Sequence, residues 1–246
     1  MTDSTIDVGV LGATGAVGQE FISQLSAHPW FNLTWIAASE RSAGRSYDQA
    51  TTWRLPIPCP ESVTKMRVDS VLPDRAPELV FSGLDSTVAG EVEEKFAKAG
   101  HLVVSNAGNH RMADDVPLLI PEVNSDHLGL LERQASVRAW AGRIVTNPNC
   151  STMMLAMALA PLRRFGLQAV NVTTLQAVSG AGYPGVAALD MLGNVIPYIG
   201  GEEEKIETET KKILGTLRDG RVDDHPVVVS AHATRVPVIN GHTEML

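Results

Sequence analysis

The chain has 246 residues, of which 44% are hydrophobic and 20% charged, and its formal net charge is −8. This length allows a sizeable core of the kind found in α/β enzymes. The acidic balance argues against a general surface for nucleic acid or for an anionic membrane, so we expect neither as a partner.

The cysteines and the N-terminus indicate the compartment. Cys59 and Cys150 lie far apart and give no disulfide framework, which favours a reducing environment. The first residues have neither the basic nor the apolar region of a secretion signal, so we expect a cytoplasmic protein. The seven histidines show no metal-ligand spacing, and no metal is expected.

The first predicted element is a buried strand over residues 6–11, which leads directly into the glycine-rich turn 12–18 and then a helix. Glycines in such a turn let the backbone approach a pyrophosphate, and the helix N-terminus that follows favours phosphate oxygens. The spacing is G-x-x-G-x-x-G rather than the usual G-x-G-x-x-G. The alternative is a tight strand-to-helix turn that binds nothing.

The second predicted strand, residues 34–38, ends at Ser39, Glu40, Arg41 and Ser42. In a dinucleotide-binding fold this point lies beside the adenosine ribose. An acidic residue there suits NAD, whereas an arginine flanked by serines suits the 2′-phosphate of NADP, and we favour NADP. The alternative is that Glu40 and Arg41 form a solvated surface pair.

Strands predicted over 78–83 and 101–106, with a helix over 86–99 between them, continue the strand–helix alternation. Such alternation predicts a parallel sheet flanked by helices, with ligands at the carboxyl ends of its strands. Small or polar residues end three strands, at 82–83, 106–108 and 146–147. They are interpreted as cofactor contacts, although turns favour the same residue types.

Cys150 stands at the start of a predicted helix that runs through residues 153–160, with Asn149 or Ser151 as its cap. The unpaired N–H groups and the positive dipole end of a helix favour a thiolate, so this placement predicts a nucleophile. The alternative is a small buried apolar residue, which is how free cysteines often serve.

The pattern changes after this helix, where residues 168–178 form one long alternating strand. A flexible loop over 179–185, a charged helix over 202–214, a strand over 227–238 and a turn over 240–244 follow. Glu202 and Lys205 share one face of the charged helix, and without further information they form an ordinary exposed ion pair. We therefore divide the chain into residues 1–149 and a second domain, residues 150–246.

Taken in order, these segments resemble the aspartate-β-semialdehyde dehydrogenases, particularly their archaeal and fungal branch. The resemblance covers the chain from Val8 onward. The segments that carry it are 12–18, 39–44, 105–112, 147–152, 176–180, 202–205 and 235–238, with His242 at the end. It implies an α/β fold with an N-terminal Rossmann-like parallel sheet and a second, α+β domain for substrate binding and dimerisation.

The resemblance also implies a role for each matching residue. Cys150 is the nucleophile, His242 its general acid/base, and Gln176 orients the acyl intermediate. Arg235 holds the substrate α-carboxylate, Glu202 its amino group, and Arg111, Lys205 and Asn149 the phosphate. The implied NADP(H) site is lined by Gly12, Thr14, Gly15, Ala16, Val17, Ser39, Arg41, Ser42, Ser179 and Gly180.

The activity implied is the NADPH-dependent reductive dephosphorylation of L-aspartyl-4-phosphate to L-aspartate 4-semialdehyde through a Cys150 thioester. This reaction serves the biosynthesis of lysine, threonine, methionine and isoleucine, in enzymes that are homodimers or homotetramers. Members of the family continue well past the turn at His242, whereas this chain ends at Leu246. We therefore expect an incomplete second domain that exposes strand edges and apolar surface.

Three alternatives remain at this point. The first is a sibling reductase of N-acetyl-γ-glutamyl phosphate or malonyl-CoA, against which Glu202 argues because it suits a free amino group. The second is a thiol acyltransferase or hydrolase, against which the glycine turn argues. The third is a non-catalytic NADP-binding fragment.

Overall fold

A computed structural model describes residues 5–246 of the chain. Contacts within the chain divide it into two compact units, one formed by Met1–His110 and Leu131–Asn147, the other by Arg111–Leu130 and Pro148–Leu246. From Pro148 onward the chain stays in the second unit. The earlier excursion of Arg111–Leu130 into the second unit was not foreseen from the sequence.

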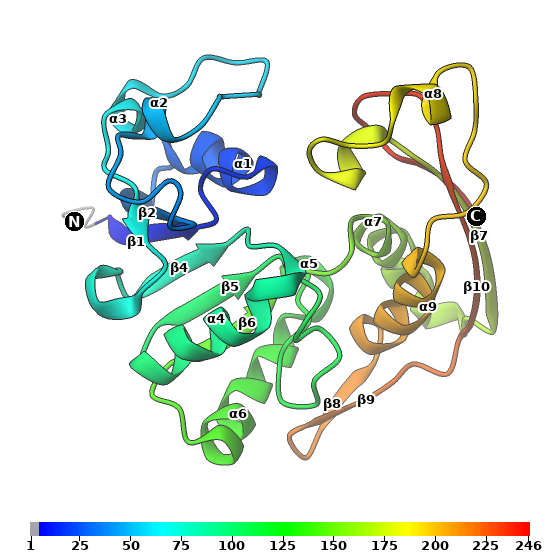
Figure 1. The fold of residues 1–246 in the computed structure, drawn as a ribbon. Helices are drawn as coiled ribbons and strands as arrows, with labels where there is room; N and C mark the ends of the chain where they lie inside the picture. The colour runs from blue at the N-terminus through cyan, green and yellow to red at the C-terminus, as the bar shows by residue number, and fades with distance from the viewer. Residues whose placement is uncertain (1–4) are drawn as a thin grey trace. The chain divides into compact units, whose positions relative to one another are not determined.

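The first unit is built on a parallel sheet of six strands in the order β3-β2-β1-β4-β5-β6 (Figure 1). The order reverses between β1 and β4, which is the point where ligands bind in open parallel sheets. Its strands are β1 (Ile6–Leu11), β2 (Phe31–Ala38), β3 (Asp69–Ser70), β4 (Leu79–Ser82), β5 (Leu102–Ser105) and β6 (Arg143–Thr146).

Helices connect these strands and supply the other half of the core. They are α1 (Ala16–Leu25), α2 (Tyr47–Ala50), α3 (Glu61–Thr64), α4 (Ser86–Ala99) and α6 (Leu130–Arg138), with a short 3-10 turn at Pro73–Arg75. Val10, Ile22 and Ile36 are fully buried in the core of this unit. Cys59 is a free thiol that packs against the same core, as expected of a structural cysteine.

Helix α4 shows how local sequence sets the limits of an element. Asp85 caps its start by accepting a hydrogen bond from the Thr87 backbone N–H, and Gly100 ends it in the left-handed conformation, with φ of 109°. Ala89, Glu93, Phe96 and Ala97 are the buried residues of the helix. Three of them are the apolar residues that a sheet-facing stripe requires, whereas Glu93 is a carboxylate in the core.

The second unit holds a sheet of three strands in the order β10-β7-β11, in which β10 is parallel and β11 antiparallel to β7. Helix α9 packs against α7 and β10 (Figure 1). The main elements are α5 (Pro121–Asn124), α7 (Cys150–Leu159), β7 (Ala169–Gln176), α8 (Ala188–Met191), α9 (Glu202–Ile213), β10 (Val228–Arg235) and β11 (Thr243–Met245). A hairpin of β8 (Thr216–Arg218) and β9 (Arg221–Asp223) and 3-10 turns at Ser125–Gly129, Ala160–Phe165 and Val178–Ala181 complete it.

The fold class expected from the sequence is confirmed: a Rossmann-like parallel sheet and a second unit of mixed helices and strands. Several bounds differ from the prediction: β2, for example, begins at Phe31 rather than at residue 34. Strand β10 ends at Arg235 rather than at Val238, because Pro237 has no N–H to continue the ladder. Residues expected in a turn form β11, in which Glu244 is the partner of Thr174 in β7.

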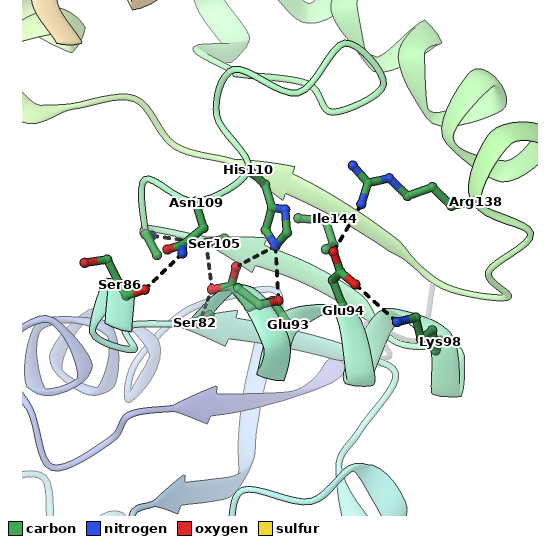
Figure 2. A network of polar contacts seen from close by, with 12 residues as sticks. Ser82, Ser86, Glu93, Glu94, Lys98, Ser105, Asn109, His110, Arg138 and Ile144 are labelled. Carbon is green, nitrogen blue, oxygen red and sulfur yellow. Dashed lines mark hydrogen bonds and ion pairs between the residues drawn. The ribbon is translucent and has the colours of Figure 1, made fainter. Parts of the chain in front are cut away.

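The strand ends of β4 and β5 are occupied by a buried polar network (Figure 2). Ser82 Oγ and Ser105 Oγ donate to Glu93 Oε1 over 2.6 and 2.7 Å. The other carboxylate oxygen of Glu93 lies 3.8 Å from His110 Nε2. Ser82 is fully buried, so the interpretation of its hydroxyl as a cofactor contact is wrong, and the hydroxyl instead ties its strand to α4.

Burial raises the pKa of Glu93, although the hydrogen bonds from Ser82 and Ser105 and the nearby His110 partly oppose this effect. We expect Glu93→Ala to lower the free energy of unfolding of the first unit by about 2 kcal/mol, because two buried hydroxyls lose their acceptor. Urea denaturation followed by tryptophan fluorescence measures this, because all four tryptophans lie in the first unit.

Glu91→Ala is the matched control, since Glu91 is an exposed residue of the same helix. We expect it to change the stability by less than about 0.5 kcal/mol. Equal urea midpoints for the two variants would contradict a structural role for the Glu93 network.

Candidate active site

Cys150 is the first residue of α7, and Asn149 is the residue that caps this helix. Asn149 Oδ1 accepts hydrogen bonds from the backbone N–H groups of Ser151 and Thr152, over 3.0 and 3.2 Å. Of the two caps considered from the sequence, Asn149 is therefore the one used, and Ser151 is buried inside the first turn. Cys150 itself is exposed, so the alternative of a buried apolar cysteine is wrong.

His242 brings its ring to the sulfur, with Nε2 3.2 Å from Cys150 Sγ. The other ring nitrogen, Nδ1, lies 3.0 Å from the backbone nitrogen of Ala177. A backbone N–H can only donate, so Nδ1 is the acceptor. The neutral ring then carries its proton on Nε2, where it points at the sulfur.

The electrostatics of this pair favour the uncharged forms. Although the residue as a whole is exposed, the protein groups packed around it reduce the hydration of the Cys150 thiolate and raise the pKa of the thiol. The nearby Glu202 raises this pKa further, against smaller opposing effects of backbone N–H groups and Arg111. The N–H groups at the helix end do favour the thiolate, as predicted, but burial and Glu202 outweigh them, so the net shift is toward the neutral thiol. Burial and the nearby Arg235 lower the pKa of His242, so the ring is neutral near neutral pH.

Glu202, at the start of α9, is the centre of a hydrogen-bond network. Its Oε2 accepts from Asn149 Nδ2 over 2.9 Å and from Gln176 Nε2 over 3.4 Å. Its Oε1 accepts from Lys205 Nζ over 2.8 Å. Glu202 is only 9% exposed, so the pair with Lys205 is not the ordinary solvated pair that the spacing alone indicated.

The charge of Glu202 is maintained by its neighbours. Burial acts to raise the pKa of this carboxyl, but the hydrogen bonds from Lys205, Asn149 and Gln176 outweigh burial and lower the pKa. Glu202 is consequently an anion in a largely enclosed position, which suits a bound cation.

Arg235, the last residue of β10, pairs in register with Gln176 at the end of β7. Its Nη1 donates to the Ala177 carbonyl over 2.8 Å and to Gln176 Oε1 over 3.4 Å. A Cβ placed on Gly180 would lie 2.9 Å from Arg235 Nη1 and 3.2 Å from His242 Cε1. Arg235 and His242 therefore both lie against Gly180, and the absence of a side chain at Gly180 makes space for them.

Arg111 is buried and donates from Nη1 to Glu209 Oε1 over 2.9 Å. The second oxygen of Glu209 accepts from the backbone N–H of Asn149 over 2.6 Å. Sequence reasoning missed Glu209. The signal was present, since Glu209 lies two turns after Glu202 and continues the face of α9 on which Glu202 and Lys205 were placed.

The second unit thus gathers most of the predicted site residues, and the first unit holds the predicted nucleotide site. In the first unit the turn after β1 is shaped for close backbone approach: Gly12 has φ of 74°, and a Cβ there would lie 2.7 Å from the Gly83 carbonyl oxygen. Tyr47 and Thr51 fix this turn by donating to the carbonyls of Ala13 and Thr14 over 2.8 and 3.2 Å.

No side chain caps the start of α1, where Gly15 is the residue before Ala16. Helix starts without a side-chain cap leave N–H groups for an anion, so this turn fits a dinucleotide pyrophosphate. Thr14 is half-buried at the turn, and Val17 is exposed in the first turn of the helix.

After β2 the backbone turns back on itself, with the Ser42 N–H donating to the Ser39 carbonyl over 2.8 Å. Arg41 and Glu40 are both exposed. Within the described residues they form no ion pair with each other, and their exposure agrees both with a cofactor contact and with solvated surface charges. Ser179 and Gly180, also assigned to the cofactor, lie in the 3-10 turn Val178–Ala181 of the second unit.

Residues 5–246 contain no group of three or more histidine, cysteine, aspartate or glutamate residues that could hold a metal ion. None of the helices in this described range has both the length and the apolar character needed to cross a membrane.

A Rossmann-like unit whose first turn fits a phosphate and a second unit with a thiol–imidazole pair are features of the nucleotide-dependent dehydrogenases. Comparison with known proteins agrees. Residues 7–131 match the family model "Semialdehyde dehydrogenase, NAD binding domain", and residues 159–246 match "Semialdehyde dehydrogenase, dimerisation domain".

Individual relatives show which semialdehyde dehydrogenases the chain resembles. The chain is 51% identical to the aspartate-semialdehyde dehydrogenase of Archaeoglobus fulgidus over 96% of this chain and 69% of the relative, and 48% identical to that of Schizosaccharomyces pombe over 96% and 68%. The crystal structure of the Candida albicans aspartate-semialdehyde dehydrogenase with NADP is similar, with a TM-score of 0.90 and 44% identity over 98% of this chain and 70% of that one. The chain belongs to the aspartate-semialdehyde dehydrogenase family.

The raised pKa of Cys150 gives a direct test of the site. Iodoacetamide reacts with the thiolate, so the alkylation rate rises with the fraction of thiolate. For an ordinary thiol, whose pKa is about 8.5, the rate levels off once the pH exceeds that value, and at Cys150 we expect it to keep rising at higher pH. Glu202→Gln removes an anion that raises the thiol pKa, so the same curve should move to lower pH. Peptide mass spectrometry separates Cys150 from Cys59.

Glu204→Gln serves as the control, because Glu204 is an exposed residue of the same helix. Its alkylation curve should coincide with that of the unmodified chain. A wild-type curve already level at neutral pH would contradict the raised pKa, and an unmoved curve in Glu202→Gln would contradict the influence of Glu202.

Proposed function

We propose that the chain catalyses the NADPH-dependent conversion of L-aspartyl-4-phosphate to L-aspartate 4-semialdehyde and inorganic phosphate. This step belongs to the biosynthesis of the aspartate family of amino acids. The observation that carries the proposal is the contact of His242 Nε2 with Cys150 Sγ at 3.2 Å, beside a buried anion and a buried cation. Membership of the family supports it.

The groups around Gln176 suit the two charges of an amino acid. Gln176 is hydrogen-bonded on one side to the Glu202 carboxylate and on the other to the Arg235 guanidinium. In the proposal Glu202 binds the substrate ammonium group and Arg235 its α-carboxylate. Gln176 then lies between them, where it orients the acyl intermediate.

Three groups are assigned to the phosphate. Arg111 and Lys205 supply positive charge, and Asn149 supplies an amide beside the nucleophile. Lys205 holds Glu202 in the unliganded chain, and a substrate ammonium at Glu202 would take over part of this pairing. The lysine is half exposed, so its ammonium group has room to move to a phosphate oxygen.

In the proposed reaction the exposed Cys150 thiol first loses its proton to solvent. The thiolate then attacks the acyl carbon, the bond from that carbon to the phosphate oxygen breaks, and a thioester and inorganic phosphate result. NADP(H), when bound, supplies the hydride chemistry at the same carbon. The Cys150 C–S bond then breaks as the carbonyl of the semialdehyde forms, and the sulfur leaves as an anion.

His242 is the proposed general acid/base. With its proton on Nε2 the neutral ring donates a hydrogen bond to the sulfur anion, both before attack and on departure. A second proton would sit on Nδ1, facing the Ala177 N–H that now donates to it. The charged ring is disfavoured there, so it gives up a proton readily to an oxygen that becomes anionic.

The residues that would hold the cofactor are Gly12, Thr14, Gly15, Ala16 and Val17 for the pyrophosphate, and Ser39, Arg41 and Ser42 for the 2′-phosphate. The shape of the turn after β1 and the uncapped start of α1 support the first group. The exposed Arg41, flanked by polar residues, supports NADP over NAD. Ser179 and Gly180 of the second unit are proposed as further contacts.

The alternatives considered from the sequence are not favoured. An N-acetylated or CoA-linked substrate has no free ammonium group to pair with the buried Glu202. A cofactor-independent thiol acyltransferase or hydrolase has no use for the turn after β1.

The dimerisation domain matched by residues 159–246 supports a homodimer or homotetramer, and the two free thiols support a reducing, cytoplasmic location.

The test is NADP-dependent oxidation of aspartate semialdehyde in phosphate buffer, followed by absorbance of the reduced cofactor. Cys150→Ser should lose most of the turnover, because a hydroxyl is a poorer nucleophile and leaving group than a thiol, while NADP affinity stays unchanged. Cys59→Ser is the matched control and should keep full activity. Wild-type turnover in Cys150→Ser would refute the assignment of the nucleophile.

Gly180→Ala tests the close packing of the acid/base and the carboxylate-binding arginine. The added methyl group would press on Arg235 Nη1 and the His242 ring, so we expect turnover to fall on the order of tenfold or more. At Gly200 a Cβ would meet nothing within 4 Å, so Gly200→Ala should leave turnover unchanged. Equal rates in the two variants would mean that Gly180 is not constrained by these side chains.

A further inference from the structure

Glu209 is a buried carboxylate that none of the roles assigned so far uses. It lies in α9 and is 2% exposed. A buried glutamate is costly unless donors satisfy both of its oxygens. The hydrogen-bond donors around Glu209 therefore indicate why a carboxylate is needed at this position.

Each oxygen of Glu209 has one donor. Oε1 accepts from Arg111 Nη1 over 2.9 Å, and Oε2 accepts from the Asn149 backbone N–H over 2.6 Å. Both partners can only donate. A carboxylate satisfies both at once, whereas an amide would turn an NH₂ group toward one of them.

The two partners are elements of the proposed chemistry. Asn149 directly precedes Cys150, and its side chain is held by Glu202 while capping α7. Glu209 adds a third restraint, on the backbone of Asn149. Arg111 is the proposed phosphate ligand. A single carboxylate, that of Glu209, therefore fixes the distance between the start of α7 and the Arg111 guanidinium.

The next turn of α9 restrains the chain after Arg111. Lys212 Nζ donates to the carbonyls of Arg111, Ala113 and Val116 over 2.7, 2.8 and 2.9 Å. The backbone that bears Arg111 is thus held by α9 through Lys212, and the tip of the side chain is held by α9 through Glu209. The arginine is fixed at both ends before any ligand arrives.

We propose that Glu209 is a positioning residue that aligns the phosphate-binding Arg111 with the start of the Cys150 helix. The proposal deepens the function given above and rests on it for the role of Arg111. Because Glu209 is buried, its assigned action is through its two partners, Arg111 and Asn149.

The experiment compares Glu209→Gln with Glu207→Gln in the full chain. Glu207 is a residue of the same helix whose Oε1 accepts from a backbone N–H, that of Ala231, over 3.1 Å. An amide can accept that single bond, so Glu207→Gln should behave like the unmodified chain. The two substitutions change charge and volume alike and differ in the donors that they face.

Two readouts do not depend on turnover. The first is hydrogen exchange of the peptide that contains the start of α7, which should become faster in Glu209→Gln because the Asn149 restraint is lost. The second is the concentration of inorganic phosphate that half-protects Cys150 from iodoacetamide, which should rise on the order of tenfold because Arg111 is misaligned. The KM for phosphate in semialdehyde oxidation should rise in parallel.

Unchanged exchange at α7 together with unchanged or tighter phosphate protection would overturn the proposal, because Glu209 would then align neither the start of α7 nor Arg111. Glu209→Asp keeps the charge but is one methylene shorter, so it should show the same changes, and it replaces Glu209→Gln if that variant does not fold. Failure of both to fold would make Glu209 a stability residue and would also overturn the proposal. The unmodified chain could show no turnover while Glu209→Gln still changes both hydrogen exchange at α7 and phosphate protection. That result would contradict the proposed function but not the positioning role of Glu209.

Discussion

Two carboxylates of α9, those of Glu202 and Glu209, hold Asn149, the residue that caps the start of α7. One accepts from the Asn149 side-chain amide and the other from its backbone N–H. The same carboxylates hold Lys205 and Arg111. In the second unit, the capping of α7, the placement of Cys150 and the placement of the two cationic side chains therefore depend on one face of α9. A substitution on that face acts on geometry and charge together, which is why matched controls on the other face are informative.

This arrangement disfavours ionisation of the Cys150 thiol. Burial and the Glu202 anion raise the pKa of Cys150, so the surroundings of the sulfur favour the neutral thiol over the thiolate. In the proposed function the substrate ammonium group neutralises Glu202, and that removes one of the effects opposing ionisation. The site would then activate its nucleophile when the correct amino-acid substrate is bound, which limits side reactions of a free thiolate. His242 fits this account because its neutral ring presents an N–H to the sulfur.

Local patterns predicted much of the structure. Helix α4 has the predicted limits because Asp85 and Gly100 mark its ends, and the turn after β1 has the predicted glycine geometry. The resemblance to a family supplied the site residues. Two features were not predictable from local sequence. Glu209 meets Arg111, a residue 98 positions away, and the sign of the Cys150 pKa shift depends on burial and on Glu202. Ser82 likewise ends a strand as predicted, but it donates to Glu93, which only the packing of α4 reveals. Contacts between distant elements decided each of these outcomes.

The central claim is that the thiol of Cys150 carries the acyl group. The most direct measurement is mass spectrometry of the chain after it is mixed with aspartate semialdehyde and NADP without phosphate and quenched in acid. Without phosphate to release the acyl group, the account predicts a mass increase of one aspartyl group on the peptide that contains Cys150. Reduced cofactor formed with no adduct on this peptide, or with the adduct on another residue, would contradict the account.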